Sequence, residues 1–225
     1  ASTITWKGMA TKNKDLKIPE GIEPDSAFVQ ILDPATGTAT FLVEVIDVIH
    51  KTMLSKWQKQ GMNEKEKLAA WNKYVPEHLL TRVHGYELMM APYAIAHMKI
   101  GLKLFETGYQ FMSDERARIY LTNSLEPPQD FSDRLAFDVP ALAHEAHAVN
   151  AIKRHQRFTV VIGNPPYSGL SANMSEEASR IIEPYKLING VHFGEKKHWL
   201  HDDYVKFFRW SETRVSAAGI GILGL

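Results

Sequence analysis

Short apolar runs alternate with longer amphipathic segments along most of the chain. An apolar run bounded by turn residues is typical of a buried strand, and apolar residues that recur every three or four positions are typical of a helix. The predicted strands cover Phe28–Leu32, Arg82–Glu87, Ala117–Leu121, Phe158–Ile162 and the beginning of Gly219–Leu225. The predicted helices cover Phe41–Lys59, Asn63–Val75, Ala91–Phe105, Pro140–Arg154 and His201–Ala217.

This alternation predicts an α/β fold, a Rossmann-like doubly wound and mostly parallel sheet that ends after its fifth strand. Residues 1–27 are expected to form an irregular N-terminal segment, because Pro19 and Pro24 interrupt it. Residues 28–225 are expected to form one domain. Ligands of such sheets bind beyond the carboxyl ends of the strands, so polar residues that follow a predicted strand are the candidates for a site.

The composition narrows the possible classes of protein. The 225 residues include no cysteine, which excludes a disulfide framework, a thiolate zinc site and a cysteine nucleophile. No apolar run is long enough to cross a bilayer and the N-terminus has no apolar signal core, so we expect a cytoplasmic protein. Lys and Arg (26) balance Asp and Glu (26), so the chain lacks the basic excess of a free-standing DNA-binding protein.

The turn after the first predicted strand runs from Asp33 to Thr40 and contains Pro, Ala, Thr and Gly. Small residues in a strand-to-helix turn let a ligand approach the free backbone N–H groups at the helix N-terminus. An ordinary strand–turn–helix joint has the same composition. The turn alone therefore leaves both interpretations open.

Two further polar residues follow predicted strands. Glu87 ends the second strand, where a carboxylate can accept hydrogen bonds from both hydroxyls of a ribose, next to an apolar face from Leu88 and Met89. Asn123 follows the third strand, where its side-chain oxygen can accept from an adenine amino group. Each residue also fits an alternative, a helix-capping acid for Glu87 and an ordinary turn for Asn123.

The most informative motif is Gly163-Asn164-Pro165-Pro166-Tyr167, directly after a predicted buried strand. Two consecutive prolines remove two backbone donors and fix the chain, which leaves the Pro165 carbonyl without a local partner. That carbonyl and the Asn164 side-chain oxygen are two neighbouring acceptors, which suit an NH2 group. Tyr167 supplies a ring that can stack on a planar base. The alternative is a rigid loop at the edge of the sheet.

Taken in order, these motifs resemble those of the amino-group (adenine-N6) DNA methyltransferases that carry Asn-Pro-Pro-Tyr. The segments ILDPATGTATFL, GYELMMAPYAIAHMKI, IYLTNSLE and VIGNPPYSG are similar to the four successive motifs of that family. The sequences of these segments and the spacing between them are most similar to the methyltransferase region of large single-chain restriction-modification enzymes. The resemblance covers roughly residues 28–225.

The resemblance implies an S-adenosylmethionine-dependent methyltransferase fold and indicates which residues would form its site. The cofactor would be bound by Asp33, Ala35, Thr36, Gly37, Thr38, Phe41, Glu87, Leu88 and Asn123. The target base would be bound by Asn164, Pro165, Pro166 and Tyr167. Two positions depart from the family pattern: Asn123 replaces the commoner Asp, and Ala39 replaces the second Gly, where a methyl group would crowd the methionine tail of the cofactor.

The activity implied is methyl transfer to the N6 amino group of an adenine flipped out of double-stranded DNA, as part of a restriction-modification system. No target-recognition domain is visible, so we expect DNA binding to depend on a missing domain, with nuclease or helicase regions fused in the parent protein. This piece alone is then expected to be weak or inactive on DNA. Two alternatives stay open: a degenerate domain that only binds cofactor, and an Asn-Pro-Pro-Tyr enzyme acting on protein glutamine or RNA guanine.

Metal binding is not expected. His144 and His147 are three residues apart, whereas the zinc-protease motif needs histidines four apart. A second group of possible metal ligands contains His192, His198, His201, Asp202 and Asp203. This segment is more typical of a polar loop followed by an Asp-capped helix. Lys196 and Lys197 are candidates for phosphate contacts.

Overall fold

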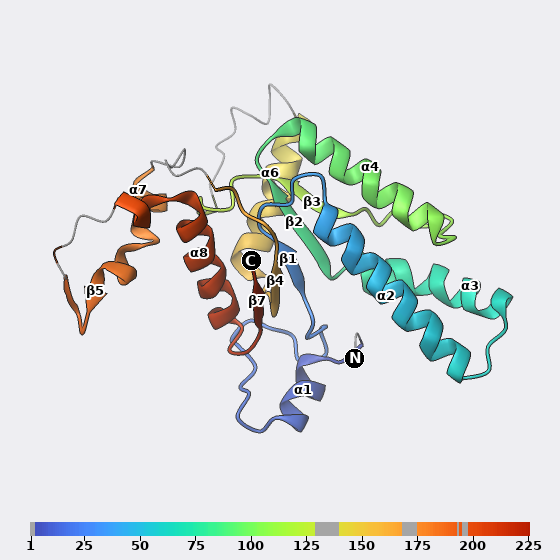
Figure 1. Cartoon of the computed structure of the whole chain (residues 1–225). Helices are drawn as coiled ribbons and strands as arrows, with labels where there is room; N and C mark the ends of the chain where they lie inside the picture. Colours follow the sequence, from blue (N-terminus) through green and yellow to red (C-terminus); the bar gives the residue numbers. More distant parts are fainter. Residues whose placement is uncertain (1–2, 129–139, 168–174, 193, 195–197) are drawn as a thin grey trace.

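The structure is a computed structural model that describes residues 3–128, 140–167, 175–192, 194 and 198–225. Its centre is a five-stranded sheet in the order β3-β2-β1-β4-β7, in which every pairing is parallel (Figure 1). The strands are β1 (Ile31–Asp33), β2 (Val83–Glu87), β3 (Arg118–Leu121), β4 (Val160–Ile162) and β7 (Ile222–Gly224). The predicted doubly wound α/β fold is confirmed.

Helices occupy both faces of this sheet. The α-helices are α1 (Trp6–Lys12), α2 (Thr40–Lys59), α3 (Glu64–Tyr74), α4 (Met90–Glu106), α6 (Pro140–His155), α7 (Glu176–Arg180) and α8 (Asp203–Ala217). Shorter elements are the π-helical turn η1 (Val75–Leu79), the 3-10 turns η2 (Glu183–Lys186) and η3 (His198–His201), and the hairpin strands β5 (Leu187–Ile188) and β6 (Val191–His192). Within the described ranges, no helix combines the length and hydropathy that a membrane crossing requires.

The alternation of side chains along the strands divides the core in two. Ile31 of β1 packs with Val83 and Ile119 against α2, α3 and α4. The neighbouring Leu32 packs on the other face, in the cluster that also holds residues of α6 and α8. Figure 1 shows α2, α3 and α4 on one side of the sheet and α8 on the other. Because parallel strands buried on both faces need apolar side chains in both directions, the continuous apolar runs of the sequence follow from this arrangement.

The N-terminal segment, the start of β1 and the end of α3 differ from the expected elements, and β4 begins at Val160 rather than Phe158. The N-terminal segment, expected to be irregular, contains helix α1, because Thr5 caps it by accepting from the Gly8 N–H (3.1 Å) and Trp6 is buried. The Trp6 ring meets the Phe28 ring edge-on at 4.9 Å. The first strand begins at Ile31 rather than Phe28, since the Phe28 N–H bonds to the Ile4 carbonyl (3.0 Å) instead of joining the sheet. The π-helical turn after α3 was not expected.

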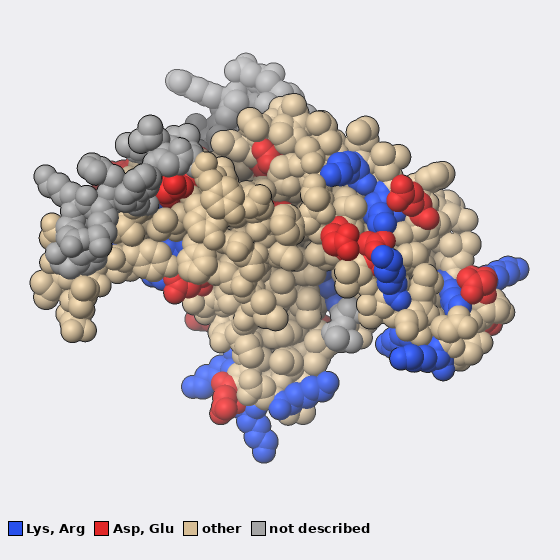
Figure 2. Space-filling view, in the orientation of Figure 1, with Lys and Arg blue, Asp and Glu red and all other residues tan. Residues whose placement is uncertain are grey.

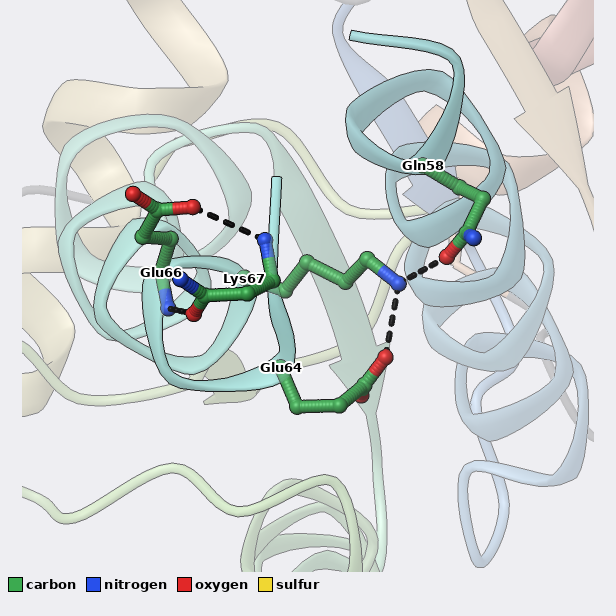
Figure 3. A network of polar contacts seen from close by, with 5 residues as sticks. Gln58, Glu64, Glu66 and Lys67 are labelled. Atoms are coloured by element: carbon green, nitrogen blue, oxygen red, sulfur yellow. Dashed lines mark hydrogen bonds and ion pairs between the residues drawn. The ribbon is translucent and has the colours of Figure 1, made fainter. Parts of the chain in front are cut away.

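The junction of α2 and α3 is held by a polar network, seen close by in Figure 3. Asn63 and Glu66 form a capping box, in which each side chain accepts from the other residue's backbone N–H (3.0 and 2.8 Å). The buried Lys67 ammonium donates to Glu64 (2.7 Å) and to Gln58 of α2. A buried ammonium needs such partners, and these contacts fix the direction in which α3 leaves α2.

Gly85 lies in the middle of β2, where a side chain has no room. A Cβ there would lie 2.8 Å from Ile119 Cδ1, 3.1 Å from Leu42 Cδ1 and still closer to the Thr36 hydroxyl. We expect Gly85→Ala to lower the free energy of unfolding by about 1–3 kcal/mol, because the overpacked strand must shift. Gly101→Ala on α4 is the matched control: its Cβ meets nothing within 4 Å, so helix propensity should stabilise it by about 0.5–1 kcal/mol. Urea unfolding of both variants measures the contrast, and equal effects would refute the packing argument.

Candidate active site

A pocket of about 400 Å³ opens at the carboxyl ends of the central strands. This volume is within the range of small-molecule sites. The pocket is lined by Pro34, Ala35, Gly37, Tyr86, Glu87, Leu88, Met89, Thr122, Asn123, Ser124, Asn164, Pro166, Asp203 and Phe207. The four motifs, far apart in the sequence, therefore meet in one cavity.

The Glu87 carboxylate joins two of these motifs. One of its oxygens accepts from the Gly37 N–H (2.8 Å) in the turn after β1, and the other accepts from the Met89 N–H (2.8 Å). The side chain is almost fully buried at the end of β2. Each carboxylate oxygen has a second lone pair, so both can still accept a hydroxyl hydrogen from a ligand. Two hydroxyls on neighbouring carbons, as in a ribose, match that pair of acceptors.

Asp33 ends β1 beneath the pocket and is 1% exposed. Its Oδ1 accepts from the Ala35 N–H (3.0 Å), whereas its buried Oδ2 has no hydrogen-bond partner among the described residues. Burial raises the pKa of this carboxyl to about 7; the Ala35 N–H opposes the shift, and the nearby Glu87 charge adds to it. Gly163 is needed beside it, since a Cβ at that position would lie 2.7 Å from Asp33 Oδ1.

Asp33 should make the stability depend on pH. Its folded pKa, about 7, lies above the ordinary value of 3.8, so the stabilisation is complete below pH 4 and is lost as the pH rises through 7. We expect ionisation of this carboxyl to lower the free energy of unfolding of the wild type by roughly 2–3 kcal/mol between pH 5 and pH 8. Asp33→Asn does not titrate and should escape that loss. Urea unfolding at both pH values measures it; a variant-to-wild-type difference that is the same at pH 5 and pH 8 would exclude this role.

The loop after β3 is attached to the rest of the site by side chains. The buried Ser124 hydroxyl donates to the Pro34 carbonyl in the turn after β1. The Asn123 side chain accepts from the Leu125 N–H (3.1 Å) and donates to Glu126 (3.1 Å). Lys153 of α6 donates to the carbonyls of Asn123 (2.7 Å) and Glu126 (3.0 Å), and burial lowers its pKa to about 8. The loop that carries Asn123 is thereby fixed at the rim of the pocket.

The Asn164–Tyr167 loop continues β4 at the same edge of the sheet. Pro165 is buried, whereas Asn164, Pro166 and Tyr167 are exposed. Tyr167 donates its hydroxyl hydrogen to the Asn164 Oδ1 (2.8 Å). The structure gives the Pro165 carbonyl no hydrogen-bond partner within the described ranges. Asn164 and Pro166 line the pocket, whereas the Pro165 carbonyl and the exposed Tyr167 ring belong to the same loop without being part of the lining.

The structure adds three lining residues that sequence reasoning missed: Tyr86, Asp203 and Phe207. Tyr86 is buried, and its hydroxyl has no partner among the described residues. Asp203 and Phe207 lie on one face of α8, one helical turn apart. The only available signal was that spacing in a predicted helix. The Asp-capped start of the helix is confirmed, since the Asp202 side chain accepts from the Tyr204 N–H (2.9 Å).

Four predicted cofactor residues do not line the pocket, and their roles stay predictions: Asp33, Thr36, Thr38 and Phe41. The Thr36 hydroxyl donates to the Asp33 carbonyl (3.0 Å) within the turn. The Thr38 hydroxyl accepts from Lys99 (3.4 Å), and Phe41 lies exposed on α2. The two threonine hydroxyls thus bond to Asp33 and Lys99, and none of these side chains is part of the pocket lining.

Ala39 also differs from expectation. Its φ of 63° is the left-handed conformation that favours glycine, at a cost of about 1–2 kcal/mol. Its methyl group is fully buried in the cluster with Leu42 and Ile46 and is absent from the pocket lining. The methyl group therefore does not crowd the cavity, and its burial offsets part of the backbone strain.

Of the residues considered for metal binding, Asp203 lines the pocket. Within the part of the chain that the structure describes, no three His, Asp or Glu side chains are grouped to hold a metal ion. Glu145 is paired with Arg116 (2.7 Å), and Lys196 and Lys197 lie outside the described residues. On the face drawn in Figure 2, Lys and Arg side chains lie around α1, along α2 and α4 and at the far ends of α2 and α3, with Asp and Glu among them.

Solved structures share this fold over nearly the whole chain. The DrdV–DNA complex is 24% identical over 95% of the chain (TM-score 0.54). A nuclease-deletion mutant of the Type ISP restriction-modification enzyme LlaGI, in complex with a DNA substrate mimic, is 18% identical over 99% of the chain, with a TM-score of 0.62. The ATP-dependent Type ISP enzyme LlaBIII bound to DNA is 20% identical over 94% (0.57). The chain spans 18%, 17% and 13% of these three chains, respectively.

No curated protein sequence matches the chain. The family model described as N-6 DNA Methylase matches residues 18–200, which include all four motifs and most of the sheet. Since that match covers well over half of the sequence, the chain belongs to the N-6 DNA methylase family.

Proposed function

We propose that this chain is the core of an S-adenosylmethionine-dependent methyltransferase that acts on the N6 amino group of adenine in DNA, within a restriction-modification system. The observation that carries the proposal is the position of the Asn164–Tyr167 loop. It borders the pocket that contains Glu87 and Asn123, so a bound cofactor and a target base would lie next to each other.

The pocket fits the cofactor by the chemistry of its lining. Glu87 would accept from the ribose hydroxyls, and the exposed Leu88 and Met89 would cover one face of the adenine. Asn123 would bind the adenine edge. When bound, S-adenosylmethionine supplies an electrophilic methyl group on its sulfonium sulfur.

The target base would be bound by the loop after β4. Adenine in a duplex must first be flipped out of the stack. Asn164 Oδ1 and the Pro165 carbonyl would each accept one hydrogen of its amino group, which favours a pyramidal nitrogen with a localised lone pair. Tyr167 would stack on the base and hold that nitrogen in line with the methyl donor. The chain's own contribution is therefore positioning and preorganised polar groups.

DNA binding is proposed to rest mainly on regions outside this chain. The zero net charge of the chain means that it has no basic excess to meet the phosphates of DNA. The three solved relatives are DNA complexes of chains that are several times longer. We accordingly expect a separate recognition domain, with nuclease or helicase activity fused to the same polypeptide.

A calorimetric titration with S-adenosylmethionine tests the cofactor half of the proposal. We expect saturable binding of one cofactor per chain, and no binding of NAD⁺ or ATP at the same concentrations. Equal binding of all three ligands would point to a general nucleotide site, and absence of saturable binding of S-adenosylmethionine would contradict the proposal.

A further inference from the structure

The ring of Tyr167 is stacked on the ring of Tyr204. Their centroids are 5.0 Å apart and their planes differ by 19°. Tyr167 belongs to the loop after β4 and is 68% exposed, so packing in the loop itself holds it weakly. The contact connects that loop to the first turn of α8.

Tyr204 is fixed much more firmly than its partner. Asp202 caps its backbone N–H (2.9 Å), and the helix that follows is anchored in the core by the buried Phe207 and Trp210. A ring on an anchored helix turn is a rigid surface on which a mobile ring can be oriented.

The second restraint on Tyr167 comes from the target-base site. Its hydroxyl donates to Asn164 Oδ1 (2.8 Å), so the stack on Tyr204 and this hydrogen bond together define the plane of the ring. One face of the ring is covered by Tyr204, which leaves the opposite face for another planar group. The amide oxygen of Asn164 keeps a second lone pair for an amino hydrogen.

We propose that Tyr204 is a positioning residue for the target base: it supports Tyr167 from behind, so that a flipped base completes a three-layered stack of Tyr204, Tyr167 and base. The inference rests on the proposed function, because it assigns the free face of Tyr167 to the base. This positioning role requires the aromatic ring of Tyr204 and does not require its hydroxyl group.

The probe is a single-stranded thymidine oligonucleotide with one central 2-aminopurine, whose fluorescence is quenched on stacking. It is titrated with the wild type in the presence of S-adenosylhomocysteine. We expect Tyr204→Ala to weaken quenching-detected binding about 2- to 12-fold, the range of an aromatic pair. Tyr204→Phe should retain wild-type binding. Phe208→Ala removes an exposed ring from the same helix and should change nothing.

Each outcome separates the inference from the proposed function. Calorimetric binding of S-adenosylhomocysteine by every variant verifies that the chain is folded. If Tyr167→Ala loses the quenching while Tyr204→Ala equals the wild type, Tyr204 has no positioning role and the proposed function stands. If neither the wild type nor Tyr167→Ala quenches the probe, the base-binding site itself is wrong. Loss of quenching in Tyr204→Phe would also overturn the inference, because the hydroxyl would then be responsible.

Discussion

Asn164→Ala should lower the rate of methyl transfer to DNA by about 100- to 1000-fold, the usual effect of removing one preorganised polar group from a reacting centre. The side chain is exposed at the mouth of the pocket and contributes no core packing, so the fold should be unaffected. We expect the rate of the transfer step to fall, because the Asn164 oxygen would favour localisation of the lone pair on the amino nitrogen during that step. Single-turnover transfer of a radiolabelled methyl group measures this rate.

The control for Asn164→Ala is its own affinity for the cofactor. Asn164, Glu87 and Asn123 all line the pocket, and we propose that Asn164 contacts the base whereas Glu87 and Asn123 bind the cofactor. Calorimetric affinity for S-adenosylmethionine should therefore stay at the wild-type value. Wild-type transfer rates in this variant would show that Asn164 does not contact the reacting amino group.

Glu87→Ala should weaken binding of S-adenosylmethionine about 100-fold or more. The substitution removes both oxygens that we propose accept from the ribose hydroxyls, and hydrogen bonds to a charged group contribute about 1.5–3 kcal/mol each. It also releases the Gly37 and Met89 N–H groups that the carboxylate holds in place (2.8 Å each), so the turn after β1 loses its link to β2. Equilibrium dialysis with labelled cofactor measures the affinity.

Glu44→Ala is the matched control for Glu87→Ala. Glu44 is an exposed carboxylate on α2 and is absent from the pocket lining, so its removal changes the net charge equally without touching the site. Its affinity for the cofactor should equal that of the wild type. If both variants lost affinity for the cofactor equally, the effect would be due to charge alone, and Glu87 would not be a ribose-binding residue.

Much of the fold could be predicted because periodicity is a local property of the sequence. The helices Thr40–Lys59 and Glu64–Tyr74 agree with their predicted ranges within one residue at each end. The order of polar residues after successive strands also predicted the pocket, since the carboxyl ends of parallel strands share one edge. Glu87, Asn123 and Asn164 meet there as expected.

The remaining features depend on contacts between distant segments. Phe207 and Asp203 reach the pocket only because α8 packs across the sheet, and nothing near them in the sequence marks that direction. Helix α1 depends on burial of Trp6 against Phe28. The direction of the Ala39 methyl group follows from its left-handed backbone, which a motif comparison does not show.

The most direct test of adenine-N6 methylation is to identify the methylated nucleoside. The chain is incubated with S-adenosylmethionine bearing a deuterated methyl group and with single-stranded DNA, which avoids the need for base flipping; the DNA is then digested and its nucleosides are analysed by mass spectrometry. Because this piece alone is expected to act weakly on DNA, we predict a low yield of deuterated N6-methyldeoxyadenosine that is above the no-enzyme blank and disappears with Asn164→Ala. Label in another nucleoside or on protein, or the same yield from Asn164→Ala, would contradict the account.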